Sequence, residues 1–154
     1  MLALHPNDFP SGLLTDPEKA NLAADGLGAY VGPANGYVLA FSNGLKVYLS
    51  GDTGLTADMD SIVGQFYQPS LTVFNISDTF VTGPEEAAFA ISKLIKAKSA
   101  IPSHANEVAT TGGKVNPGTR TARFIELLPD IPAYVPRSGV TMEFDSDGKC
   151  VKGC

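Results

Sequence analysis

The sequence lacks a long apolar run, a basic start and any cluster of lysine and arginine. No stretch of about 18 apolar residues occurs, so we expect no membrane-spanning helix and no membrane partner. The first residues do not resemble a signal peptide, and any export signal would lie upstream of them. The net charge is −5. Because an acidic surface repels phosphate backbones, the composition also argues against a nucleic-acid partner.

Cysteine is scarce, with Cys150 and Cys154 as the only two. Such a closely spaced pair can form a small disulfide loop in an oxidising compartment or stay free in a reducing one. A metal role is less favoured, because zinc sites usually need four ligands and no further cysteine is present. The pair favours a periplasmic or extracellular location and leaves a cytoplasmic one open.

With 154 residues and 44% hydrophobic residues, the chain is long enough for one domain with a core. Residues 1–35 form a leading loop region in which only residues 16–24 favour a short helix. Residues 36–145 are expected to form an α/β core, and residues 146–154 a tail. A domain that opens on a long loop is unusual, because loops normally connect elements.

The core alternates strand and helix patterns. An Asn-Gly pair joins two β-rich runs and predicts a hairpin, because both residues tolerate positive φ. The expected strands are residues 37–41, 45–49, 71–76, 99–102, 133–135 and 140–144, the last two closing the sheet. The expected helices are residues 58–67, 84–98 and 119–128, and residues 110–118 form a glycine-rich loop. This order predicts an α/β fold with a mixed sheet and flanking helices.

Three of the predicted strands are followed by a residue able to bind a metal or a proton: Asp52, Asp78 and His104. In open α/β sheets, ligands collect at the carboxyl ends of the strands. Each residue also has a structural interpretation. Asp52 can bond its own backbone in a tight turn, Asp78 can cap the segment before Gly83, and His104 can lie at the surface. The other histidine, His5, lies in the leading loop.

Four short motifs, taken together, resemble those of the metallo-β-lactamase-fold hydrolases. They are Gly-Asp-Thr-Gly at 51–54, Asp-Met at 58–59, Gly-Pro-Glu-Glu-Ala at 83–87 and Pro-Ser-His at 102–104. The most similar branch contains the ascorbate-6-phosphate lactonase-like proteins. The resemblance covers about residues 1–145 and implies the C-terminal part of an αββα sandwich.

The resemblance also implies a metal site. Asp52 matches an aspartate that bridges two metal ions, His104 matches a ligand of the second ion, and His5 is the candidate ligand of the first. The ions would be zinc, or else manganese or iron. Such ions lower the pKa of a bound water toward about 7, so that hydroxide attacks an ester, lactone or phosphoester in a small-molecule substrate. Asp78 would orient the ligand or accept a proton.

The His-x-His-x-Asp-His ligand block of that family is absent. Because a stable zinc site needs at least three protein ligands, we expect a truncated domain that is weakly active or inactive by itself. A separate N-terminal segment or a second copy in a homodimer would have to complete the site. The alternatives are a non-catalytic folded remnant, which could dimerise, and a small-ligand binding module at Asp52, Asp78 and His104.

Overall fold

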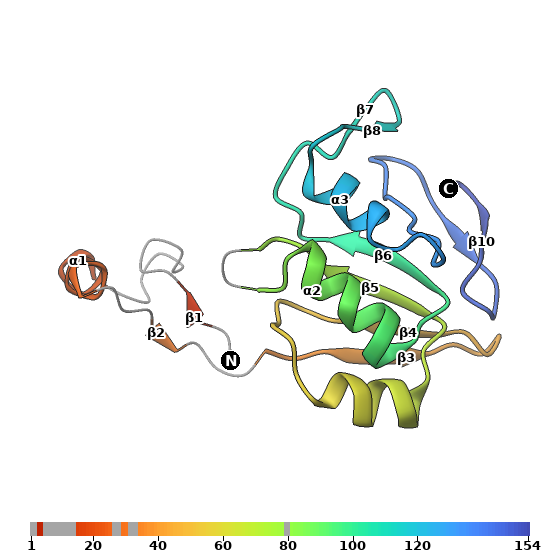
Figure 1. Ribbon diagram of the computed structural model, residues 1–154, viewed down its shortest axis with the longest axis horizontal. Helices are drawn as coiled ribbons and strands as arrows, with labels where there is room; N and C mark the ends of the chain where they lie inside the picture. The colour runs from red at the N-terminus through yellow and green to blue at the C-terminus, as the bar shows by residue number, and fades with distance from the viewer. Residues whose placement is uncertain (1–2, 5–14, 26–28, 31–33, 79–80) are drawn as a thin grey trace.

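The computed structural model describes residues 3–4, 15–25, 29–30, 34–78 and 81–154. Its centre is a four-stranded sheet in the order β3-β4-β5-β6 (Figure 1). The strands are β3 (Tyr37–Ala40), β4 (Lys46–Leu49), β5 (Leu71–Asn75) and β6 (Ser99–Ser103). β3 runs antiparallel to β4, and β4, β5 and β6 run parallel to one another. The predicted mixed sheet is therefore confirmed.

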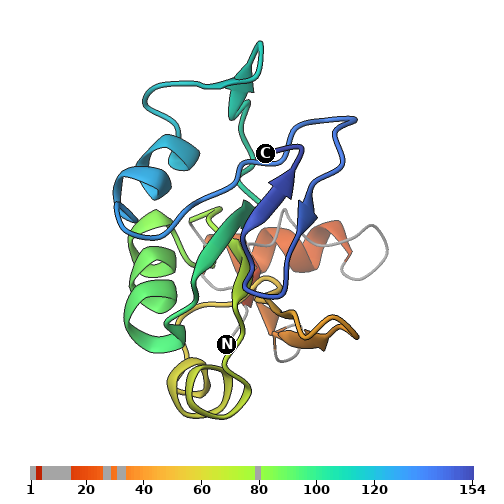
Figure 2. The same ribbon diagram turned by 90° about the vertical axis from the view of Figure 1, so that its right-hand side faces the viewer.

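Helices cover one face of this sheet, as Figure 2 shows. They are η2 (Met59–Tyr67), α2 (Pro84–Phe89), its continuation η3 (Ala90–Ile95), and α3 (Arg120–Glu126). η2 and η3 have the wider turns of π-helices. The main core lies between sheet and helices, where Phe74 and Phe124 have no exposed surface. Burial of each of these side chains contributes about 1.5–3 kcal/mol. The three predicted helices are confirmed in position.

The other face of the sheet is covered near β5 and β6 by the segment that follows α3. Leu71 and Ile101 form a second apolar cluster there, against which Tyr134 and Phe144 pack. Residues 133–135 were expected to add a strand, but Ala133 makes only an isolated bridge to Ala100. Prolines at positions 132 and 136 flank this segment. Because proline has no N–H to donate, a longer ladder cannot form there.

The C-terminal end is a hairpin rather than a tail. β9 (Glu143–Phe144) pairs antiparallel with β10 (Cys150–Lys152) in a sheet of its own. The prediction that residues 140–144 join the main sheet is therefore wrong. Residues 145–149 turn the chain back, so the nearest strand available to β9 is β10. Cys150 and Cys154 form a disulfide, the first of the alternatives that the sequence left open.

The predicted β3–β4 hairpin is confirmed, with one difference in its turn. Gly44 has a φ of 91°, whereas Asn43 keeps a negative φ. Gly44 N–H donates to Phe41 O at 3.0 Å, and the Asn43 side chain accepts a hydrogen bond from Leu45 N–H at 3.1 Å. This is the pattern of a longer hairpin loop in which glycine alone takes the left-handed conformation.

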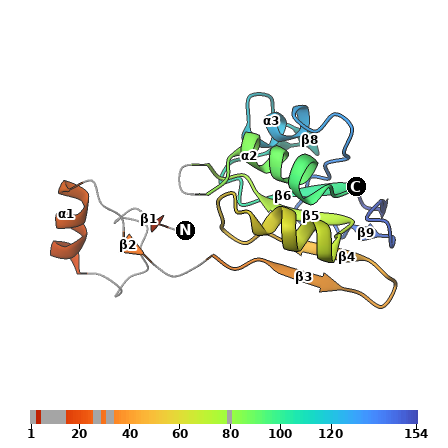
Figure 3. The same ribbon diagram turned by 60° about the horizontal axis from the view of Figure 1, so that its bottom comes forward.

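The described part of the leading region lies to one side of the α/β body (Figures 1 and 3). It contains α1 (Asp16–Ala24) and the antiparallel pair β1 (Ala3–Leu4) and β2 (Ala29–Tyr30). α1 was predicted; it begins with a capping box between Thr15 and Glu18 and buries no side chain. The predicted glycine-rich loop contains the short hairpin β7 (Thr110–Thr111) and β8 (Lys114–Val115). Within the described ranges, every helix is too short or too polar to cross a bilayer.

Candidate metal site at the carboxyl end of the sheet

Asp52 and His104 meet at the carboxyl edge of the central sheet. Asp52 follows β4 and His104 follows β6, and His104 Nδ1 lies 2.9 Å from Asp52 Oδ1. Their side chains are 56% and 38% exposed, respectively. Parallel strands end at the same edge, which is why residues 52 positions apart along the chain come together there. The pair faces solvent and is open to a ligand.

The loop that carries Asp52 requires glycine at position 51. Gly51 has a φ of 60°, a conformation that residues with a Cβ adopt at a cost. A Cβ atom at this position would also lie 2.4 Å from the carbonyl oxygen of Asn35. The close approach of the Asn35 backbone and the positive φ together set the direction in which the chain leaves β4. That direction places Asp52 over the sheet edge.

A buried side-chain network also holds this loop, and Asn75 at the end of β5 is its centre. Asn75 is 1% exposed, and its amide donates to Gly51 O at 2.7 Å and to Thr53 O and Ser50 Oγ at 3.2 Å. Ser50 Oγ in turn accepts from the Asn75 backbone N–H at 3.0 Å. The Thr82 hydroxyl donates to the Asn75 side-chain oxygen. Since Gly51 and Thr53 flank Asp52, the hydrogen bonds from Asn75 hold the backbone on both sides of the aspartate.

The loop that carries His104 is held by α3. His104 has a φ of 50°, and Ala105 O accepts a hydrogen bond from Arg120 Nη1 at 3.2 Å. Glu107 caps the start of α3, since its carboxylate accepts from the N–H groups of Arg120 at 2.9 Å and Thr121 at 2.8 Å. The Thr121 hydroxyl adds a further hydrogen bond at 2.9 Å. Anionic acceptors suit the N-terminus of a helix, where backbone N–H groups lack partners.

These contacts change the pKa of Glu107. Burial acts to raise it, but the hydrogen bonds from Thr121 and Arg120 outweigh burial, and the pKa lies below its ordinary value of 4.5. Glu107 therefore stays a carboxylate in weakly acidic solution. Hydrogen bonds to the charged form have this effect in general.

Asp78 follows β5, as predicted, and lies at the start of the segment that leads to α2. It has a φ of 65°, and its N–H donates to Thr82 O at 3.2 Å. A Cβ added at Gly83 would lie 3.3 Å from the Asp78 carboxyl carbon. The carboxyl thus sits against the N-terminus of α2. Its predicted part in catalysis stays a prediction.

Of the three predicted metal ligands, the structure brings together Asp52 and His104. The predicted ligand His5 lies outside the described residues, and no group of three or more His, Cys, Asp or Glu able to hold an ion occurs within them. A carboxylate and an imidazole 2.9 Å apart can belong to one zinc ion, whose bonds to nitrogen and oxygen are about 2.0–2.2 Å. The donor types fit a metal, but two ligands do not complete its shell.

The residues that position the two loops were not among the site residues predicted from the sequence. Asn75 interrupts the apolar run of residues 71–76, and a polar residue inside a buried strand normally has hydrogen-bond partners. That interruption was the available signal for Asn75. Glu107 left no comparable signal, because its contact with α3 depends on how a loop folds back over more than ten residues.

The chain is similar to curated metal-dependent hydrolases. It is 43% identical over 97 residues to a UPF0173 metal-dependent hydrolase of Chloroflexus aurantiacus, a match that covers 63% of this chain and 39% of that relative. A UPF0173 metal-dependent hydrolase of Methanobrevibacter smithii is 32% identical over 116 residues, covering 75% and 47% of the two chains. The matches thus span less than half the length of these relatives. No protein-family model matches the chain.

Two solved structures show a weaker likeness. Igni18, a metallo hydrolase of Ignicoccus hospitalis, aligns with a TM-score of 0.48 and 21% identity over 86% of this chain and 64% of its own. A protein of Thermotoga maritima described as a Zn-dependent hydrolase of the metallo-β-lactamase superfamily aligns with a TM-score of 0.47 and 20% identity, over 66% and 58%. The curated relatives are the stronger finding. They show that this chain is related in sequence to metal-dependent hydrolases, as its motifs predicted.

Proposed function

We propose that the chain forms part of a metal-dependent hydrolase of the metallo-β-lactamase superfamily, in which Asp52 and His104 bind the metal. The observation that carries the proposal is their convergence to 2.9 Å from the ends of β4 and β6. The sequence relatives named metal-dependent hydrolases support it. Zinc is the first candidate, and manganese and iron are the alternatives.

The chemistry of the proposed site follows from the residues present. A bound metal ion would supply hydroxide at neutral pH. Asp52 and His104 would hold the ion at the exposed sheet edge, and Asn75 and Gly51 would keep Asp52 in place. Further ligands must come from outside the described residues, either from His5 or from another segment or copy of the chain. We propose an ester, lactone or phosphoester as substrate, in keeping with the ascorbate-6-phosphate lactonase-like branch, with Asp78 orienting it.

Metal content of the purified full chain tests this proposal. Zinc, manganese and iron are measured by elemental analysis after dialysis, and zinc affinity by titration calorimetry, for wild type, Asp52→Ala, His104→Ala and Asp130→Ala. Asp130 is exposed and lies between α3 and Ala133, which pairs with Ala100 in β6, so it serves as the control. We expect wild type and Asp130→Ala to bind zinc, and the two site variants to lose it. A wild type that stays free of metal at saturating zinc would contradict the proposal.

Turnover is measured on the same samples with a carboxylic ester, a lactone and a phosphodiester. We expect the preferred class to be hydrolysed only by the metal-loaded proteins. Hydrolysis that survives in Asp52→Ala would show that another site is responsible.

A second candidate function, a non-catalytic dimeric binding module, is favoured by the edge strand β3. Tyr37, Leu39 and Phe41 point to the same side and are 60%, 42% and 50% exposed. Uncharged, unpaired edge strands are ready to pair with another strand. Because residues 37–41 carry no charge, two copies could pair there despite the net charge of −5. Light scattering should then show a dimer for wild type and Val151→Lys, and a monomer for Leu39→Lys.

A further inference from the structure

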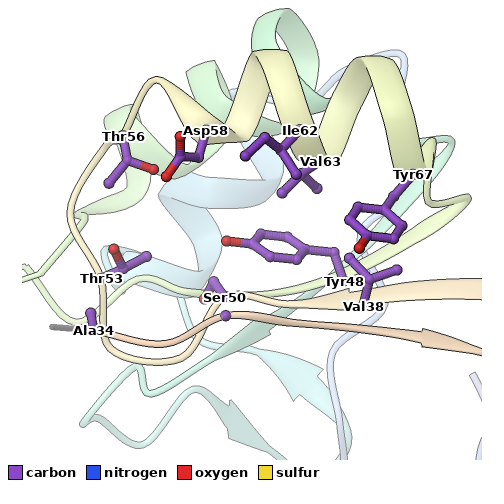
Figure 4. A pocket seen from close by; sticks show the side chains of 11 residues that line it. Ala34, Val38, Tyr48, Ser50, Thr53, Thr56, Asp58, Ile62, Val63 and Tyr67 are labelled. Carbon is purple, nitrogen blue, oxygen red and sulfur yellow. The ribbon is translucent and has the colours of Figure 1, made fainter.

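A cavity of about 320 Å³ lies between η2 and the strands β3 and β4 (Figure 4). It is on the helix-covered side of the sheet, beside the edge strand β3. Asp52 and His104 are not among the residues that line it. Its volume is at the lower end of the range for small-molecule sites. The cavity therefore does not contain the proposed metal ligands, although Ser50 and Thr53 beside Asp52 line it, and it is large enough for a compact organic ligand.

The two ends of the cavity differ in chemistry. Val38, Val63 and Tyr67 line one end, and Thr53, Thr56 and Asp58 line the other. Figure 4 shows the Tyr48 ring running between the two ends, with its hydroxyl directed toward the polar one. An apolar wall with a few convergent polar groups is typical of sites that bind small amphipathic molecules.

Tyr48 and Gly36 shape the floor of the cavity. A Cβ at Gly36 would lie 2.8 Å from the Tyr48 ring and hydroxyl, so glycine allows the ring to lie this close to the backbone. The hydroxyl makes no hydrogen bond to another described residue. Burial raises the pKa of Tyr48, and the nearby Asp58 charge raises it further. The hydroxyl is therefore a proton-bearing group with room for a partner in the cavity.

Among the described residues that line the cavity, Asp58 is the one that carries a charge. It has no Lys, Arg or His within salt-bridge distance among the described residues, and its side chain does not cap η2. Asp60, two residues further on in the first turn of η2, instead accepts a hydrogen bond from Gln65 at 3.1 Å. The cavity thus combines a carboxylate that lacks a cationic partner in the described chain with two aromatic rings, and both attract cations.

We propose that this cavity is a binding site for a small organic amine with an apolar body. The ammonium group pairs with Asp58. No described residue of the cavity wall carries a positive charge that would compete for this carboxylate. The apolar body packs against Val38, Val63 and Tyr67, and the Tyr48 ring lies beside the cation. A neutral or anionic molecule of the same shape binds less well, because it leaves the Asp58 carboxylate without a partner or repels it.

The test uses phenethylamine as the probe and the full chain as the protein. Binding is followed by amide chemical shifts at neutral pH, where an aliphatic amine is charged. We expect a dissociation constant on the order of 1 mM, with shifts concentrated in η2, β3 and β4. 2-Phenylethanol and 3-phenylpropionate have a similar shape and should bind at least about tenfold more weakly, which corresponds to about 1.4 kcal/mol.

Asp58→Asn and Asp60→Asn form a matched pair of variants. Both remove a carboxylate at the start of η2, Asp58 at the N-cap position and Asp60 in the first turn, but Asp58 lines the cavity and Asp60 does not. We expect Asp58→Asn to weaken phenethylamine binding about tenfold and Asp60→Asn to leave it unchanged. Circular dichroism checks that both fold. Equal affinity in wild type and Asp58→Asn, or shifts located away from the cavity, or no binding by wild type, would overturn the proposal.

Discussion

The loop after β4 and the loop after β6 present Asp52 and His104 to each other, yet different kinds of hydrogen bond hold them. The β4 loop rests on Asn75, a neutral side chain that is 1% exposed. The β6 loop rests on Glu107, a half-buried carboxylate that caps α3. One anchor is uncharged and deeply buried, and the other is charged and nearer to water.

The difference predicts how each half of the site responds to its surroundings. A neutral buried network does not titrate, so it holds Asp52 equally well over a wide pH range. A carboxylate cap depends on its charge and weakens when it is protonated. Acid should therefore loosen the His104 side of the site before the Asp52 side.

The largest effect is expected from Asn75→Ala. The variant removes the donor for Gly51 O and Thr53 O and leaves the Thr82 hydroxyl without its side-chain acceptor. Unpaired buried polar groups are costly, so the free energy of unfolding should fall by about 3 kcal/mol. Urea denaturation measures it. Asn116→Ala, which removes one exposed hydrogen bond to Val108 O, is the control and should cost less than about 1 kcal/mol. Equal losses in the two variants would show that Asn75 is not a special anchor.

A smaller effect is expected from Glu107→Gln. Glutamine keeps one acceptor oxygen but loses the charge that strengthens the hydrogen bonds from Arg120 and Thr121. At neutral pH we expect a loss of about 1–2 kcal/mol in the free energy of unfolding. A variant as stable as wild type would mean that the cap adds nothing beyond what water supplies.

The pH dependence separates the two anchors further. The pKa of Glu107 is lowered in the folded chain from 4.5, so its stabilising contribution is present above about pH 4.5. The contribution is lost as pH falls through the lowered folded value. The stability difference between wild type and Glu107→Gln should therefore shrink in this acidic range, while the difference for Asn75→Ala stays constant. If the stability difference between wild type and Glu107→Gln stayed as constant with pH as that for Asn75→Ala, the comparison would be contradicted.

The smallest effect is expected from Asn106→Gly, which tests the direct link between the loops after β5 and β6. Asn106 donates to Ser77 Oγ at 3.3 Å at the surface and has a φ of 52°. Glycine tolerates that φ, so only a long exposed hydrogen bond is lost. The free energy of unfolding should change by no more than about 0.5 kcal/mol. A loss as large as that of Glu107→Gln would show that the β6 loop depends on this contact rather than on α3.

Much of the fold could be predicted because its signals are local. The apolar runs at residues 45–49, 71–76 and 99–102 end where β4, β5 and β6 end, within a residue or so. The same pattern placed Asp52, Asp78 and His104 after these strands. The sequence predictions were wrong where the fold depends on which strand pairs with which. Residues 140–144 have a strand-like composition, but nothing in their own sequence says that β10 rather than β6 will be their neighbour.

The sequence by itself determined the alternation of strands and helices and the chain positions of Asp52 and His104, because backbone preference and apolar periodicity act over a few residues. The tertiary structure decided how the side chains meet. It set the 2.9 Å contact between Asp52 and His104, the hydrogen bonds around Asn75, and the cavity beside Asp58. Each of these depends on sheet order and loop direction, which arise from packing between segments far apart in the chain.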